Sequence, residues 1–259
     1  MQQKEIISHI VGWLKNYCDS SGMNGFVIGI SGGIDSALTS TLCAMTGKRT
    51  LVLTLPIRQH EPEQARADEH IKWLMTKFKD VSHSRTDLTP AFETIEKTFP
   101  KEIRDFLSMA NSRARLRMLT LYAYAGHHKL LVAGTGNKVE DLGVGFFTKY
   151  GDGGVDLSPI ADLLKSEVRS LAKELGIVES ILVAAPTDGL WPDKRTDEDQ
   201  LGASYDELEW AMNFQLSGKK EKDLSDRQKY VLDLFLKLNK MNQHKMKPIP
   251  VCIIPHDMR

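Results

Sequence analysis

The sequence contains few cysteines, and they show no pairing pattern. Cys18, Cys43 and Cys252 lie far apart, and no Cys-x-x-Cys motif occurs. This argues against a disulfide framework and favours a reducing compartment, so we expect a cytoplasmic protein. The same scarcity excludes a zinc ribbon and a thiol-relay mechanism.

Long apolar runs and an excess of charge are also missing. No apolar stretch approaches the length of a transmembrane helix, and the polar residues 1–5 are unlike a signal peptide. Lysine plus arginine number 34, as do aspartate plus glutamate, so the formal net charge is zero. A neutral chain has no general attraction for nucleic acid or a membrane surface, and we expect neither as a partner.

The most informative segment is residues 26–36. Residues 26–30 (Phe-Val-Ile-Gly-Ile) are typical of a buried strand, and a helical pattern follows residues 31–36 (Ser-Gly-Gly-Ile-Asp-Ser). The glycines leave backbone N–H groups uncovered, and a helix N-terminus adds positive potential, so the segment predicts a phosphate site. Ser31 and Ser36 can add hydroxyl donors. The alternative is an ordinary glycine turn in which Asp35 only caps the helix.

A carboxylate at Asp35 would repel a phosphate unless a divalent cation lies between them. Mg²⁺ binds one or two protein carboxylates together with phosphate oxygens and water. A second buried run, residues 130–133, leads into a segment that contains Glu140. Because the carboxyl ends of parallel strands meet at one edge of a sheet, Glu140 can supply the second carboxylate. A loop acid in water is the alternative for Glu140.

Strand-like runs and helical patterns alternate along the chain. This alternation predicts an α/β fold with a doubly wound, mostly parallel five-stranded sheet and helices on both faces. The strand-like runs lie at 26–30, 50–55, 81–84 and 130–133, and the helical patterns at 3–18, 35–46, 62–79 and 101–125.

We expect a single domain over residues 1–259. The core sheet should occupy about 26–176, and two helices with capping boxes and a tail should occupy 204–259. Residues 186–203 have low apolar content and two prolines, which favours a mobile lid over the site. In the loop that follows residues 50–55, Arg58 or Gln59 can contact a nucleotide, or can simply be polar loop residues.

Residues 31–36 resemble the pyrophosphate-binding loop of the N-type ATP pyrophosphatases. They do not form a Walker loop, because its terminal Gly-Lys-Ser/Thr is missing. The resemblance implies a Rossmann-like fold of the adenine nucleotide alpha hydrolase-like type. By itself it does not distinguish among members such as NAD synthetase, GMP synthetase and asparagine synthetase.

Further segments resemble NAD synthetases in particular, and the resemblance covers almost the whole chain. Residues 111–118 fit Asn-x-x-Ala-Arg-x-Arg-Met, 134–140 fit Gly-Thr-x-x-x-x-Glu, and 146–156 fit Phe-x-Thr-Lys-Tyr-Gly-Asp-Gly-x-x-Asp. His244-Lys245 resembles a C-terminal family pair. Between Glu140 and Phe146 the chain has one residue more than some family members, so the register of 141–145 stays open.

The resemblance implies roles for individual residues. Asp35, Asp152 and Lys165 would be catalytic, and Asp35 and Glu140 would hold Mg²⁺. For Lys165, a solvent-facing lysine is the alternative. The implied ATP site is Gly29, Ile30, Ser31, Gly32, Gly33, Ile34, Asp35, Ser36, Thr135, Lys165 and Thr187. The implied site for nicotinic acid adenine dinucleotide (deamido-NAD) is Arg117, Tyr122, Phe146, Lys149, Asp156, His244 and Lys245.

The implied activity is that of an ammonia-dependent NAD synthetase, a ligase that completes NAD biosynthesis. ATP would convert the pyridine carboxylate of deamido-NAD into an acyl adenylate with release of pyrophosphate, and ammonia would then displace AMP. We see no glutaminase region, and we expect a homodimer from the family. The rivals are a different ligase on this scaffold, such as the synthetase subunit of GMP synthetase, and a non-enzymatic ATP-binding module.

Overall fold

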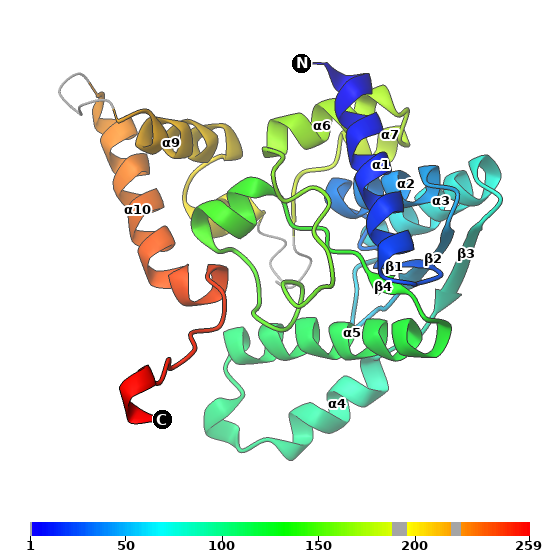
Figure 1. The fold of residues 1–259 in the computed structure, drawn as a ribbon, viewed down its shortest axis with the longest axis horizontal. Coiled ribbons are helices and arrows are strands. Elements are labelled where there is room, and N and C mark those ends of the chain that lie inside the picture. The colour runs from blue at the N-terminus through cyan, green and yellow to red at the C-terminus, as the bar shows by residue number, and fades with distance from the viewer. Residues whose placement is uncertain (1, 188–195, 219–223) are drawn as a thin grey trace.

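A parallel sheet lies at the centre of the computed structural model, which describes residues 2–187, 196–218 and 224–259 (Figure 1). Its strands pair in the order β3-β2-β1-β4, and every pairing is parallel. Their bounds are β1 (Gly25–Gly29), β2 (Arg49–Thr54), β3 (Val81–Arg85) and β4 (Leu131–Val132). The direction of the strand order reverses between β1 and β4, so a crevice opens at their carboxyl ends.

The doubly wound fold is confirmed, with one fewer strand than predicted. Beyond these four strands, the described residues form an isolated parallel bridge between Ala133 and Leu157. The bridge continues β4 by one position, and the chain then leaves the sheet. β4 itself is only two residues long, because the backbone turns at Gly134 toward the crevice.

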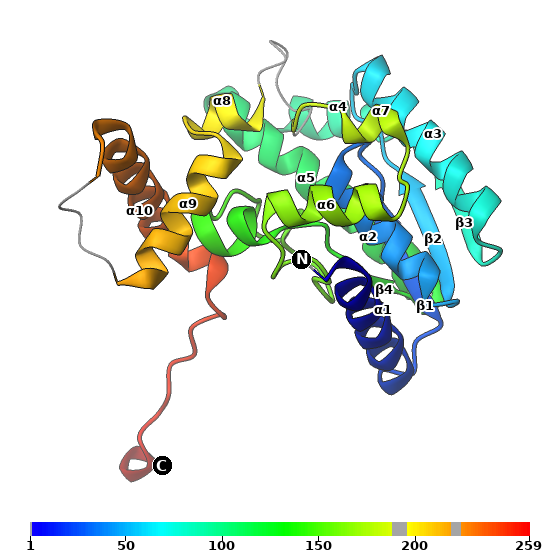
Figure 2. The same cartoon turned by 90° about the horizontal axis from the view of Figure 1, so that it is seen from above.

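Helices cover both faces of the sheet (Figure 2). One face packs against α1 (Gln3–Ser20), α2 (Ile34–Met45), α3 (Glu61–Lys77), α6 (Lys165–Glu174) and α7 (Glu179–Leu182). The other face packs against α4 (Thr89–Thr98) and α5 (Phe106–His128), which are joined through η1 (Lys101–Ile103).

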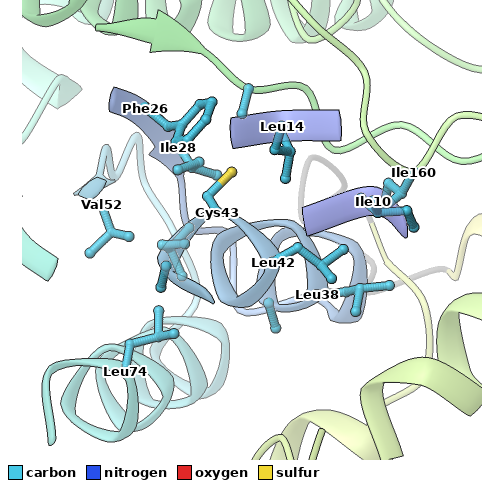
Figure 3. Packing of buried hydrophobic residues seen from close by; sticks show 14 of the residues in the cluster. Ile10, Leu14, Phe26, Ile28, Leu38, Leu42, Cys43, Val52, Leu74 and Ile160 are labelled. Atoms are coloured by element: carbon cyan, nitrogen blue, oxygen red, sulfur yellow. The ribbon is translucent and has the colours of Figure 1, made fainter. Parts of the chain in front are cut away.

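Alternation along β1 explains this arrangement. Phe26 and Ile28 point to the α2 face and Val27 to the α5 face, and all three are fully buried. Figure 3 shows Phe26 and Ile28 beside Leu14 of α1 and Cys43 of α2. A strand buried on both faces has the continuous apolar run that its sequence shows.

Two boundaries differ from the periodic pattern. The helix expected from residue 101 begins at Phe106, because the Asp105 carboxylate accepts a hydrogen bond of 3.0 Å from the Ser108 N–H and caps it. The segment η2 (Val139–Val144) is a π-turn. Such a turn accommodates one residue more than an α-turn, which fits the longer spacing between Glu140 and Phe146.

The C-terminal helices form a third apolar cluster with η2. They are α8 (Asp197–Leu201), α9 (Tyr205–Ser217) and α10 (Asp226–Met246), followed by the short η4 (His256–Met258). The capping boxes predicted at Ser204 and Ser225 are both present. Residues 247–259 are exposed and extend away from the body (Figure 2).

Part of the predicted lid, residues 188–195, lies outside the described residues. Among the helices described, none combines the length and the apolar character needed to cross a bilayer.

The buried histidine between α2 and α3 should make stability depend on pH. His70 is fully buried, its Nε2 lies 3.0 Å from Ser40 Oγ, and burial lowers its pKa from 6.5 to about 4. The unfolded chain takes up a proton near pH 6.5, whereas the folded chain resists until near pH 4. The stability contributed by neutral His70 is therefore present at pH 7 and lost as the pH falls through this window, by up to about 3 kcal/mol.

Urea unfolding of wild type and His70→Gln at pH 7, 5.5 and 4.5 checks this prediction. The stability advantage of wild type over the variant should shrink as the pH falls. His9→Gln, at an exposed position of α1, is the control and should parallel wild type. A constant difference between wild type and His70→Gln across this range would contradict the prediction.

Candidate active site

A pocket of about 550 Å³ lies at the carboxyl ends of β1 and β4. Its floor is the loop between β1 and α2, and its walls come from α5, the loop after β4, and the start of α6. Thr187 and Asp197, from the described parts of the segment predicted as a lid, also line it. Every residue predicted to bind ATP lines this pocket, namely Gly29, Ile30, Ser31, Gly32, Gly33, Ile34, Asp35, Ser36, Thr135, Lys165 and Thr187.

Serine side chains of the loop after β1 stabilise the conformation of that loop. Ser31 Oγ accepts a hydrogen bond from the Gly33 N–H at 3.1 Å and lies 3.1 Å from Ser36 Oγ. The first bond of α2 runs from the Ala37 N–H to the Gly33 carbonyl, so the N–H groups of Ile34, Asp35 and Ser36 have no acceptor within the helix. These N–H groups and the helix dipole make the predicted anion site physically sound.

Gly32 fits this loop for two reasons. Its φ is +85°, and a Cβ atom on it would lie 2.4 Å from the Glu63 carbonyl oxygen of α3. The loop therefore packs directly against the backbone of α3. From the same helix, Arg66 lines the pocket and donates to the Gly32 carbonyl at 3.2 Å. Arg66 lies in an ordinary helical pattern, which gave no sign of this contact.

Asp35 and Glu140 meet on a single cation. The Lys165 ammonium lies 2.5 Å from Asp35 Oδ2 and 3.0 Å from Glu140 Oε1, and only 3% of the lysine side chain is exposed. The two acids follow different strands, and Lys165 is the first residue of α6, so three segments converge here. The alternatives of a solvated Glu140 and a solvent-facing Lys165 are thus excluded.

The triad combines two acidic side chains with a single ammonium. Burial alone would lower the pKa of Lys165, but the charges of Asp35 and Glu140 outweigh it and raise that pKa, so the lysine stays protonated. Burial raises the pKa of Asp35; the charge of Lys165 opposes this, and that of Glu140 reinforces it. A site with two acids and one ammonium favours further positive charge.

Two further polar residues, which the sequence did not indicate, contact the triad. The Tyr205 hydroxyl lies 2.5 Å from Glu140 Oε1, and Lys165 Nζ lies 4.6 Å from the centre of the Tyr205 ring. Asn137 donates to Asp35 Oδ1 at 3.3 Å and accepts from the Glu140 N–H at 3.2 Å. Tyr205 follows a helix cap in the last third of the chain, where no local pattern indicates a site.

The glycine-rich loop 145–156 forms another wall. Lys245 of α10 donates to the carbonyls of Gly145 and Phe147, and Phe146, Asp152 and Lys245 all line the pocket. The Thr148 N–H donates to Asp152 Oδ1 at 3.1 Å. Desolvation by the surrounding protein raises the pKa of Asp152, which is the direction a proton acceptor requires.

The other residues predicted to bind deamido-NAD divide between the pocket and the outer surface. Arg117 lines the pocket and donates to the Leu55 carbonyl at 3.0 Å and to Gln59 at 2.9 Å. Gln59 lines the pocket too, whereas Arg58 pairs with Glu93 and Glu96.

Tyr122, Lys149, Asp156 and His244 are not among the residues that line the pocket. Tyr122 donates to Asp156 Oδ1 at 3.0 Å, and Lys149 donates to the His244 carbonyl at 2.8 Å. These two pairs connect segments far apart in the sequence on the exposed side of α5 and at the end of α10. Their binding roles remain predictions.

A parallel sheet that reverses direction above a glycine loop, with paired acids at the reversal, defines a nucleotide-binding α/β protein. Comparison with known proteins narrows this class, because the sequence profile of the NAD synthase family matches residues 6–249. The NH(3)-dependent NAD(+) synthetase of Methanosarcina acetivorans is 37% identical over 252 residues, spanning 94% of this chain and 96% of that protein. The chain therefore belongs to the NAD synthase family.

Solved structures agree. The NMN synthetase of Francisella tularensis superposes with a TM-score of 0.84 at 34% identity and covers 99% of both chains. The NH3-dependent NAD synthetase of Campylobacter jejuni, in complex with nitrate, has a TM-score of 0.81 at 24% identity, covers 98% of this chain and 100% of its own, and supports the fold.

Alanine at Gly32 should disrupt the nucleotide loop beyond the cost of its backbone conformation. Gly22→Ala is a matched control, because Gly22 also has a positive φ, +64°, but nothing lies within 4 Å of an added Cβ. Gly22→Ala should cost about 1 kcal/mol of stability from the left-handed backbone alone. Gly32→Ala should cost at least about 2 kcal/mol, because the Glu63 carbonyl must move.

Thermal unfolding of both variants with and without ATP measures the effect. Stabilisation by ATP should persist in Gly22→Ala and disappear in Gly32→Ala. Equal responses of the two variants would show that the loop does not depend on its contact with α3.

Proposed function

We propose that this protein is an ATP-dependent ligase that amidates the pyridine carboxylate of deamido-NAD with ammonia, forming NAD, AMP and pyrophosphate. The observation that carries the proposal is the convergence of Asp35, Glu140 and Lys165 on one point beside the loop 31–36. An adenylation places negative charge on departing pyrophosphate, and groups fixed in advance around that charge lower the barrier. Family membership supports this choice among reactions of the fold.

The residues act by position and charge. The N–H groups and hydroxyls of the loop 31–36 hold the phosphates, and Lys165 donates to the oxygens that gain charge as pyrophosphate leaves. Arg117 and Phe146 hold the second substrate on the opposite wall, so that its carboxylate faces the α-phosphate. Asp152 takes the proton that ammonium must lose before it attacks the acyl adenylate.

Mg²⁺ fits the pair Asp35 and Glu140. The Lys165 ammonium is a cation already bound by both carboxylates, which shows that their oxygens converge on one positive charge. No group of three or more histidine, cysteine or acidic side chains in the described ranges could hold a metal, which suits an ion that takes its remaining ligands from phosphates and water. When bound, the ion neutralises charge on the polyphosphate.

We also propose a cytoplasmic homodimer that works as a single domain over residues 1–259, with residues 186–203 acting as the lid. The outer side of α5 supports the dimer: Leu119 is 68% exposed, and Tyr122, on the same helix, is 40% exposed. A partner seated there would also cover the Tyr122–Asp156 pair, which would bring that pair to the dinucleotide.

A second candidate substrate is the corresponding mononucleotide. The NMN synthetase of Francisella tularensis shares the fold over nearly its full length, so the same scaffold serves a smaller product. The pyridine end of either substrate would occupy the same wall, and only the dinucleotide would extend to the outer residues Tyr122, Lys149, Asp156 and His244.

Product analysis with ATP, Mg²⁺ and ammonium chloride tests the proposal. We expect amidation of deamido-NAD at a kcat/KM at least about tenfold above that for nicotinic acid mononucleotide, because the outer residues add binding energy only for the dinucleotide. The reverse preference would favour the second candidate. Pyrophosphate release with XMP, without amidation of either the dinucleotide or the mononucleotide, would indicate another ligase of this fold.

Asp35→Ala should reduce the rate of pyrophosphate formation at least about 100-fold, because it removes half of the cation site. Asp162→Ala is the control: this acid is 93% exposed and pairs with Lys138 outside the pocket. A similar rate in both variants would contradict the assignment of Asp35.

Sedimentation velocity tests the dimer. Leu119→Glu should shift the protein toward monomer, because a charge would be buried against the partner. Leu216→Glu, at a leucine of α9 that is 74% exposed, is the matched control and should stay dimeric. A wild-type monomer at micromolar concentration would refute the proposal.

A further inference from the structure

The position of Lys165 carries an inference that rests on the proposed function and extends it. Lysine side chains are long, and a lysine in a nucleotide pocket can place its ammonium at many points. Here Nζ lies between the two carboxylates, above the Tyr205 ring, with 97% of the side chain withdrawn from solvent. The ammonium therefore occupies the centre of the site at which a divalent cation would bind.

Two cations cannot share this place. A magnesium ion needs carboxylate oxygens at about 2.0–2.1 Å, and a manganous ion only slightly farther away. Oxygens that already lie 2.5 Å and 3.0 Å from Nζ would bring such an ion into contact with the ammonium. Lys165 must therefore leave before a metal can take its place between Asp35 Oδ2 and Glu140 Oε1.

Leaving is costly unless the lysine gains another partner. Displaced by a free metal ion, the buried ammonium would have neither carboxylate as a counter-ion. A polyphosphate on the adjacent loop 31–36 changes this, because its oxygens would accept from Nζ while they also ligate the metal. Metal and nucleotide then favour each other through the movement of one side chain.

We propose that Lys165 is a resident counter-ion that keeps Asp35 and Glu140 together and excludes divalent metal until nucleotide phosphates arrive. The metal thus enters with the nucleotide and not before it. When displaced, the lysine is released a short distance from the charge it must neutralise on pyrophosphate. One side chain both guards the metal site and serves the reaction.

Tyr205 is the positioning residue of this device. Its hydroxyl holds Glu140 at 2.5 Å and lies 3.4 Å from Asp197 Oδ2, and the tyrosine is fully buried. Glu140 therefore has a partner that does not leave with Lys165. Because Tyr205 belongs to α9 and Asp197 to α8, these two C-terminal helices hold the metal carboxylate in place.

Manganous ion alone, without nucleotide, tests the proposal. Binding is followed by the loss of the free Mn²⁺ signal in electron paramagnetic resonance, which does not depend on activity. Wild type should bind weakly, and Lys165→Met should bind at least tenfold more tightly. Lys138→Met removes a nearby surface cation that pairs with Asp162 at 2.8 Å, and its affinity should match that of wild type. Equal affinities of wild type and Lys165→Met would overturn the proposal.

Tyr205→Phe in the Lys165→Met background separates the positioning role from fold. Loss of the hydroxyl should weaken Mn²⁺ binding at least fivefold, while circular dichroism stays unchanged. An unchanged affinity would show that Tyr205 does not position Glu140 for metal binding.

A measurement on wild type tests the proposal even if the Lys165→Met variant does not fold. Water proton relaxation should be enhanced by wild type with Mn²⁺ plus a non-hydrolysable ATP analogue, and little by wild type with Mn²⁺ alone. Strong enhancement by the metal alone would overturn the proposal. If these results hold while no amidation is observed, the proposed reaction is wrong and the role of Lys165 stands.

Discussion

The buried contact of one ammonium with two carboxylates is the constraint on which the rest of this structure depends. Asp35 lies in the first turn of α2, Glu140 in η2 and Lys165 at the start of α6. Tyr205 connects this contact to the C-terminal helices. Buried charges are tolerated only when each has its partners, and removal of one partner typically costs about 3–5 kcal/mol. The triad therefore fixes how the central sheet, α6 and α9 lie relative to one another.

The same contact shows how residues of a binding site can also hold structural elements together. Two acids cannot lie buried and close together without compensation, and here Lys165 supplies it through one flexible side chain. The proposed divalent cation would provide the same compensation once the lysine has moved.

Much of this site could be predicted because its signals are local in the sequence. The strand, glycine turn and helix start around residues 26–36 carry their own chemistry, and Glu140 follows from the rule that parallel strands end at one edge. Tyr205, Asn137 and Arg66 could not be found in this way, since their roles arise from contacts across 34 to 102 positions and no periodicity encodes them. A fifth strand was predicted, but the described residues form a four-stranded sheet with an isolated bridge. Whether an extended segment joins a sheet depends on its neighbour, which local patterns do not reveal.

Helix α5 illustrates a further limit of motif reasoning. Arg117 and Tyr122 were grouped by resemblance, but five positions on a helix turn through about 140° beyond a full turn. One side chain faces the pocket, and the other faces out toward Asp156. Two residues of one motif that face different sides of a helix can bind the same ligand only if the ligand extends to both sides, or if a second subunit connects them.

The π-turn at Val139–Val144 has a consequence for reading relatives of this chain. In any homologue that closes this segment with an α-turn, the five positions after Glu140 are offset by one. In a sequence alignment, residue roles can then be transferred by position up to Glu140 and again from Phe146. Transfer at the positions between them would be wrong. Superposition in space on those two anchors restores the correspondence.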